Sequence, residues 1–158
     1  MFVLVCHGRM TRMTERREAT AMGEHPAYVH TVLDCERPRE LAEFYRQFLG
    51  LVYRPGDEPP TDGSADDADW LVLTRPDGTR QLAFQQVERL ARTTWPDDAV
   101  PQQLHVDYRV DSVAELEGHK DTALGLGATL RLDRTDDEEE PLYVLADPAG
   151  HTFCLFVG

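Results

Sequence analysis

Cysteine is scarce in this chain, and its placement excludes two classes of protein. The 158 residues include three cysteines, Cys6, Cys35 and Cys154, which lie far apart in the sequence. An odd number at such spacings builds neither a disulfide framework nor a Cys-x-x-Cys redox or zinc motif. We therefore expect a reducing compartment and predict a cytoplasmic location.

Basic residues and long apolar runs are also few. The chain has 16 Lys and Arg against 29 Asp and Glu, a formal charge of −13, whereas nucleic-acid binding needs clustered basic side chains. No apolar run approaches the roughly 18 residues of a membrane-spanning helix. The opening residues 1–6 lack a basic leader and a cleavage site. We expect neither nucleic acid nor a membrane as a partner.

The N-terminal residues 1–26 show no sustained apolar period and are predicted to form a tail, disordered or partly packed. Folding signals begin only at Tyr28, which favours Met22 as the true start of translation. Farther along, the acidic run 136–140 lacks the ligand spacing of a calcium loop, so we expect a solvated loop there.

An internal repeat is the strongest feature that is present. Residues 70–78, Trp-Leu-Val-Leu-Thr-Arg-Pro-Asp-Gly, reappear at 142–150 as Leu-Tyr-Val-Leu-Ala-Asp-Pro-Ala-Gly. A second matching pair precedes them, with His30 and His105 at equivalent places. Two similar modules in one small chain usually share a core and form a cleft between them.

Each module shows the same predicted order of elements: strand, helix and three further strands. The first helix begins at Pro38 and stops at Gly50, and the second begins at a capping box formed by Ser112 and Glu115. The predicted strands are 28–35, 51–54, 70–74, 81–87, 104–110, 129–132 and one on either side of the turn at 147–150. The expected organisation is a first module over 27–90, a linker over 91–102 and a second module over 103–158, together one structural domain.

This order resembles the vicinal oxygen chelate superfamily, which groups glyoxalase I, bleomycin- and fosfomycin-resistance proteins and extradiol dioxygenases. The resemblance rests on Leu41-Ala-Glu-Phe-Tyr45 with Phe48-Leu-Gly50, on the repeated histidine before each helix, and on Asp147-Pro-Ala-Gly150. It covers about residues 28–157 and is nearest to the glyoxalase-like domain group. It implies an α+β fold in which two βαβββ modules form a curved, mixed eight-stranded sheet, an open cup with the helices outside.

The resemblance also implies where a metal would bind. Metal-using members place one ligand on the first strand and one on the last strand of each module, usually two His or Gln and two Glu. The matching positions here are His30, His105 and Cys154, with Leu82 or Ala83 as the fourth. Because the family's glutamates are missing, we expect no cofactor and no metal. The open alternative is a site of His30, His105 and Cys154 for zinc, nickel, manganese or iron.

Strand alternation predicts the ligand-facing side chains independently. It places His30 with Asp34 on one face of the first strand, and His105 with Asp107 on one face of the fifth. The predicted ligand-binding residues are His30, Asp34, Trp70, Gln85, His105, Asp107 and Cys154. No catalytic residue is assigned, although the carboxylates or histidines could act as general bases, and Cys154 as a nucleophile if His105 lowers its pKa.

The expected function is the binding of a small molecule in the cup between the modules, without the usual metal site. One alternative is a metal-dependent lyase, isomerase or dioxygenase that acts on a chelating oxygen substrate. The other is a regulatory module that binds a partner protein through an apolar patch. Since drug-binding relatives commonly dimerise, the resemblance also implies a homodimer.

Overall fold

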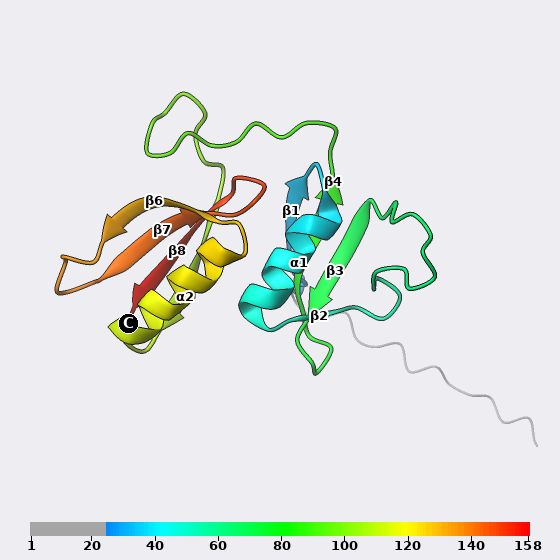
Figure 1. Cartoon of the computed structure of the whole chain (residues 1–158), viewed down its shortest axis with the longest axis horizontal. Coiled ribbons are helices and arrows are strands. Elements are labelled where there is room, and N and C mark those ends of the chain that lie inside the picture. Colours follow the sequence, from blue (N-terminus) through cyan, green and yellow to red (C-terminus); the bar gives the residue numbers. More distant parts are fainter. Residues whose placement is uncertain (1–24) are drawn as a thin grey trace, which may run out of the picture.

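The computed structural model describes residues 25–158, which form two βαβββ modules (Figure 1). The first contains β1 (Thr31–Cys35), α1 (Pro38–Leu49), β2 (Val52–Tyr53), β3 (Trp70–Thr74) and β4 (Arg80–Gln86). The second contains β5 (His105–Val110), α2 (Val113–Gly125), β6 (Thr129–Arg134), β7 (Leu142–Ala146) and β8 (Thr152–Val157). The predicted α+β fold of two modules is confirmed. The predictions for the tail and for Met22 fall on residues 1–24, outside the described part of the chain.

The eight strands are divided between two four-stranded sheets. Their orders are β1-β4-β3-β2 and β5-β8-β7-β6, with one parallel pair in each, β1 with β4 and β5 with β8. Within residues 25–158, no backbone ladder joins the two sheets. The modules therefore meet through side chains and not through one continuous sheet.

Pairing partners decide where the strands begin and end. β1 starts at Thr31, opposite Leu82 on β4, so His30 lies just before the strand and not within it. At the other end of the chain, β6 continues to Arg134 because it pairs there with Leu142 on β7. The bounds of both strands differ from the predicted ones because a strand extends only as far as the neighbouring strand offers backbone groups for pairing.

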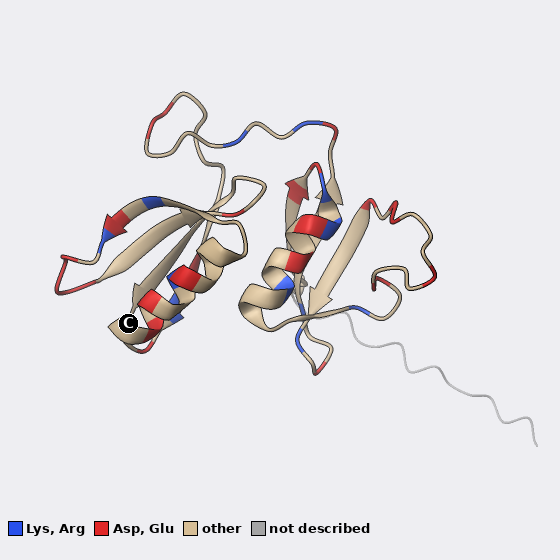
Figure 2. Cartoon of the chain, in the orientation of Figure 1, with Lys and Arg blue, Asp and Glu red and all other residues tan. Residues whose placement is uncertain are grey.

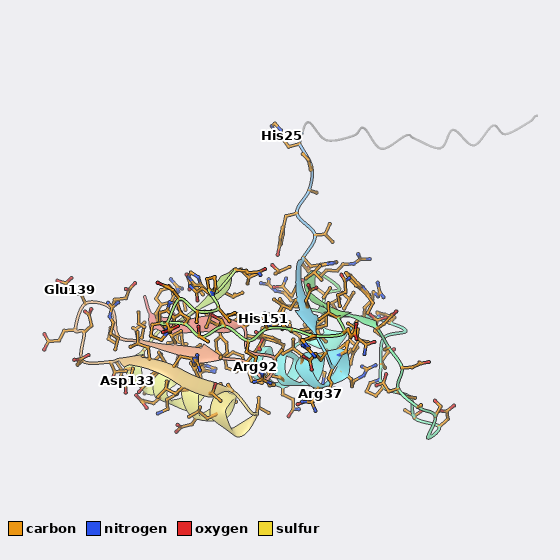
Figure 3. The ribbon with its side chains drawn as sticks, turned by 90° about the horizontal axis from the view of Figure 1, so that it is seen from above. His25, Arg37, Arg92, Asp133, Glu139 and His151 are labelled. Carbon is orange, nitrogen blue, oxygen red and sulfur yellow. The ribbon has the colours of Figure 1, made fainter. Side chains whose placement is uncertain are left out.

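The two helices lie on the same side of the two sheets (Figures 1 and 3). Helix α1 has Pro38 in its first turn and ends at Gly50, whose φ of 64° suits a residue without a Cβ. Helix α2 is capped as predicted, since the Ser112 hydroxyl accepts from the Glu115 amide at 3.3 Å. Neither helix of the described residues is long and apolar enough to cross a membrane.

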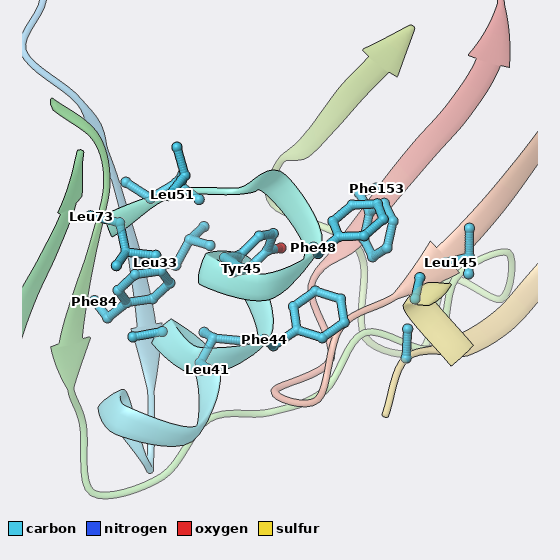
Figure 4. Close-up of a cluster of buried hydrophobic side chains, with 14 of the residues drawn as sticks. Leu33, Leu41, Phe44, Tyr45, Phe48, Leu51, Leu73, Phe84, Leu145 and Phe153 are labelled. Carbon is cyan, nitrogen blue, oxygen red and sulfur yellow. The ribbon is translucent and has the colours of Figure 1, made fainter. Parts of the chain in front are cut away.

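Aromatic side chains of α1 join the cores of both modules (Figure 4). The rings of Phe44 and Phe48 lie 6.2 and 5.5 Å from that of Phe153 on β8. Tyr108 of β5 meets Phe48 edge to face at 5.8 Å. Because offset and edge-to-face pairs add to the free energy gained by burial, α1 holds the second module against the first.

One buried hydrogen bond also crosses between the modules. The Tyr45 hydroxyl of α1 donates to Oδ2 of Asp147, which lies in the turn between β7 and β8, at 2.9 Å. Burial, and then the charge of Asp147, raise the pKa of Tyr45 well above its usual value. The hydroxyl therefore stays protonated and keeps its role as donor.

Candidate functional site

The sheet faces turned away from the helices carry polar side chains (Figure 3). On β1, Asp34 is exposed while its neighbours Leu33 and Cys35 are buried. On β5, His105 and Asp107 are exposed. The alternation expected for a half-buried strand thus directs the polar side chains of both modules toward solvent.

Three of the predicted residues meet on the exposed face of the second module. Asp107 on β5 lies directly opposite Cys154 on β8, and His105 precedes Asp107 by two positions on the same face. One potential ligand atom from each lies within 4.8 Å of the other two. His105 Nε2 is 3.6 Å from an Asp107 oxygen. We call these residues the three-donor cluster.

The thiol of this cluster is held in its protonated form. Partial burial, and then the neighbouring Asp107 carboxylate, raise the pKa of Cys154 to about 11. The condition for a nucleophilic Cys154, a pKa lowered by His105, is not met, because burial and the carboxylate dominate the environment of the thiol. Without a bound cation, Cys154 is therefore a poor nucleophile at neutral pH.

Gln102, from the segment before β5, supports the cluster. Its side-chain nitrogen lies 3.5 Å from His105 Nδ1, and its oxygen accepts from the Thr152 hydroxyl at 2.6 Å. The amide thus ties the histidine to the start of β8. Such contacts to the second ring nitrogen orient a metal-ligating or catalytic histidine.

His30 does not join the three-donor cluster. Its ring lies 6.3 Å from that of Trp70, and its Nδ1 is buried without a partner among residues 25–158. Burial, followed by the charges of Arg80 and Arg54, lowers the pKa of His30. The neutral imidazole is therefore favoured in the first module.

Strand register identifies the first-module counterpart of Cys154. Val32 lies opposite Ala83 on β4, just as Asp107 lies opposite Cys154 on β8. Ala83 therefore occupies the position left open between Leu82 and Ala83 in the sequence. An alanine offers no ligand atom, so the first module cannot complete a four-ligand set of the family's kind. The residues at these four positions therefore do not fit the family's usual metal site.

The other predicted residues of the first module form a row across three strands. Gln85 on β4 lies opposite Asp34 of β1 on one side and Trp70 of β3 on the other. Trp70 is 36 % exposed. A carboxylate, an amide and an indole thus lie next to one another on this sheet face.

A cleft of about 440 Å³ lies between the modules, beneath the segment that links them. Figure 1 shows this linker passing from the end of β4 to the start of β5. The cleft is lined by Val32, Leu33, Asp34, Arg89, Leu90, Ala91, Thr93, Val100, Pro101, Gln102, Gln103, Leu104, Gly150, His151 and Thr152. Of the seven predicted ligand-binding residues, only Asp34 is among them.

Sequence reasoning missed the linker residues and His151 as parts of a site. The linker has no apolar period, so nothing in its pattern placed Arg89 or Gln102 over the sheets. His151 did leave a signal, since it follows Asp147 by four residues across a Pro-Ala-Gly turn. In the structure its Nδ1 lies 3.0 Å from Asp147 Oδ2.

Comparison with known proteins identifies the fold and the family. The glyoxalase-like domain family matches residues 30–156, and no curated protein matches the chain. A glyoxalase/bleomycin resistance protein/dioxygenase family enzyme from Burkholderia phytofirmans PsJN shares 14 % identity at a TM-score of 0.58, over 82 % of this chain and 96 % of that one.

Two fosfomycin resistance proteins named FosX share the fold at similarly low identity. The one from Listeria monocytogenes, in its tetragonal form, is 13 % identical with a TM-score of 0.61, over 85 % of this chain and 92 % of that one. The one from Mesorhizobium loti is 16 % identical with a TM-score of 0.57, over 87 % and 94 %. With a family match that spans both modules, this chain belongs to the glyoxalase-like domain family, in the vicinal oxygen chelate superfamily.

Proposed function

We propose that this protein binds a small molecule in the cleft between its two modules. The single observation that carries the proposal is the cleft itself, whose volume of about 440 Å³ falls within the usual range for ligand sites. Residues from β1, the linker and β8 converge on it. A site at the junction of two modules is also where ligand pockets commonly lie.

The lining of the cleft favours an uncharged or cationic ligand. Val32, Leu90 and Val100 supply apolar surface, and the charges of Asp34 and Arg89 are of opposite sign. Figure 2 shows acidic residues on both helices and most loops, in line with the formal charge of −13. A net negative field lowers the local concentration of anions.

Amide shifts of ¹⁵N-labelled protein would test this function with a library of uncharged and cationic fragments. We expect hits to shift the amides of Val32, Ala91 and Thr152. Ala91→Trp should abolish these shifts by filling the cleft, because Ala91 lines it. Ala99→Trp is the matched control, an exposed alanine of the same linker outside the lining. Shifts scattered over the surface, or unchanged by Ala91→Trp, would contradict the proposal.

The three-donor cluster favours a second candidate function, a metal-dependent lyase, isomerase or dioxygenase. His105, Asp107 and Cys154 combine imidazole, carboxylate and thiol, a set that suits zinc and leaves a coordination position open. A bound divalent ion would supply a Lewis acid for two substrate oxygens. The chain's own part would be to orient His105 through Gln102 and to present all three donors on one exposed face.

Cobalt binding followed by absorption spectroscopy would test the cluster without any substrate. A thiolate bound to Co²⁺ gives a charge-transfer band, which Cys154→Ser should remove and Asp107→Asn should weaken. His30→Ala distinguishes the two ligand sets, since it leaves the band intact if Asp107 is the third ligand and weakens it if His30 is. No band above that of Cys154→Ser would contradict a metal site here.

We also propose that the protein forms a homodimer. The support is exposed apolar surface on and beside the open sheet faces, at Val29, Val32, Trp70 and Leu104. Light scattering after size-exclusion chromatography should give twice the chain mass of 17.9 kDa. A mass of one chain at micromolar concentration would contradict a dimer.

A further inference from the structure

The turn between β7 and β8 is built around the buried carboxylate of Asp147, which is 1 % exposed. Its Oδ1 accepts from the backbone amides of Ala149, Gly150 and His151 at 2.9, 2.8 and 3.0 Å. These bonds satisfy the amides of Ala149 and His151 and give a second acceptor to that of Gly150, which also donates to the Asp147 carbonyl. The carboxylate is thereby fixed in position and acts as an acceptor.

The second oxygen of Asp147 sets the position of the proton on His151. Oδ2 accepts from the Tyr45 hydroxyl at 2.9 Å and lies 3.0 Å from His151 Nδ1. In its four other hydrogen bonds this carboxylate is the acceptor, so we assign Nδ1 as the donor in the contact with His151. In a neutral imidazole, the other nitrogen, Nε2, then carries a free lone pair.

The residue that carries this lone pair, His151, is one of those that line the cleft. Its side chain is 16 % exposed. Within residues 25–158, Nε2 of His151 has no hydrogen-bond partner. It is not a buried atom either, because the one buried side-chain nitrogen or oxygen without a partner in this part of the chain is Nδ1 of His30. Nε2 is therefore not sealed off. Figure 3 places His151 close to where the linker crosses between the modules.

We propose that Asp147 and His151 form a general-base dyad that faces the cleft, a role that rests on the proposed binding of a small molecule there. The substrate class is an uncharged small molecule with a C–H bond made acidic by an adjacent electron-withdrawing group. The C–H bond breaks, its proton passes to Nε2, and its electron pair stays on the ligand. Asp147 offsets the positive charge of the resulting imidazolium.

Charged groups near the dyad come from β1 and from the linker, and α1 adds the neutral hydroxyl of Tyr45. Asp34 of β1 and Arg89 of the linker share the cleft with His151. Arg92 of the linker donates to the carbonyl of Pro148 at 2.6 Å, so it is held against the turn. Tyr45 of α1 remains a neutral donor because burial and the charge of Asp147 raise its pKa. No carboxylate other than Asp147 contacts the ring in the described chain.

The tautomer of His151 provides the first test. Long-range ¹H–¹⁵N spectra of labelled protein at neutral pH, assigned by comparison with His151→Gln, should show a proton on Nδ1 and none on Nε2. His105 is an internal contrast, because its Nε2, not its Nδ1, faces a carboxylate. A proton on Nε2 of neutral His151 would overturn the dyad.

A base in a cleft can also be tested with 5-nitrobenzisoxazole, which opens to a coloured cyanonitrophenolate when its C–H proton is removed. The reaction needs no other reactant, since the N–O bond breaks as the electron pair shifts. We expect His151→Gln to lower the catalysed rate by about 10²-fold or more. Asp147→Asn should lower the rate too, with circular dichroism checking its fold. His119→Gln, on the exposed surface of α2, is the matched control and should leave the rate unchanged.

The readouts separate failure of the dyad from failure of cleft binding. Probe-induced amide shifts at Val32 and Thr152, combined with equal rates for wild type and His151→Gln, would overturn the dyad alone. Absence of those shifts would instead contradict binding in the cleft, and the tautomer would still decide the dyad. Loss of both shifts and rate in Ala91→Trp, with the His151 tautomer unchanged, would support both proposals.

Discussion

The first module buries its helix deeply, whereas the second leaves most of its helix exposed. Six residues of α1 are buried, among them Leu41, Phe44 and Phe48, but only Leu116 and Ala123 are buried in α2. The difference arises because α1 packs against its own sheet and against Phe153 of the second module. One helix thus serves both cores.

On the exposed sheet faces, the second module and not the first gathers potential ligand side chains. The second module places His105, Asp107 and Cys154 together, while the first has Val32 and Ala83 at the positions of Asp107 and Cys154. The repeated units therefore have diverged in role. The first module contributes most of the shared core, and the second carries the three-donor cluster.

The largest expected effect is on stability and contrasts the two helices. Leu41→Ala on α1 should lower the free energy of unfolding by about 2–5 kcal/mol, because the side chain is 1 % exposed and leaves a cavity. Leu124→Ala on α2 is the matched control. Because Leu124 is 37 % exposed, this substitution should change the free energy of unfolding by no more than about 0.5 kcal/mol. Urea unfolding would measure both, and equal losses would contradict the unequal roles of the helices.

A smaller effect should follow from loss of the hydrogen bond that joins the modules. Tyr45→Phe removes the hydroxyl that donates to buried Asp147 and should cost about 1.5–3 kcal/mol. Tyr53→Phe removes a similar bond, to Glu43 at 2.8 Å, but within the first module and in a more exposed place. It should cost less than about 1 kcal/mol. A larger loss for Tyr53→Phe than for Tyr45→Phe would argue against the bond between modules as a stabilising link.

The fold could be predicted from the sequence because its signals are local and repeated. The apolar spacing at Leu41, Phe44 and Phe48 marks α1, and the two Pro–Gly turns mark the same strand pair in each module. The packing of α1 on β8 is a contact between residues far apart in the sequence. Helical periodicity states which face of α1 is apolar but not that two sheets share it.

The candidate site could be predicted only in part, for a related reason. Alternation placed His105 and Asp107 on one face, but the position of Cys154 opposite Asp107 depends on the register of β5 and β8, which no local pattern encodes. A cleft between the modules was predicted, but its lining by the linker was missed because linker segments such as 89–93 have no period. Their place over the sheets follows from tertiary packing.

The smallest expected effect contrasts the two described cysteines, in a Cys6→Ser background. Burial raises the pKa of Cys35 to about 12, and that of Cys154 is raised to about 11 by partial burial and Asp107. At pH 8 we expect Ellman's reagent to label one thiol slowly in the folded protein, and Cys154→Ser to abolish this labelling. Cys35 should react only after unfolding.

Asp107→Asn sharpens the same measurement, because it removes the charge that raises the pKa of Cys154. The thiolate fraction at pH 8 should then rise, and labelling of Cys154 should become faster by a few-fold, since the larger cause, burial, remains. Asp34→Asn, on the first module, is the matched control and should leave the rate unchanged. Equal rates for wild type and Asp107→Asn would mean that the carboxylate and thiol do not meet on the second module in solution. The chemical difference between the two sheet faces would then lose its strongest support.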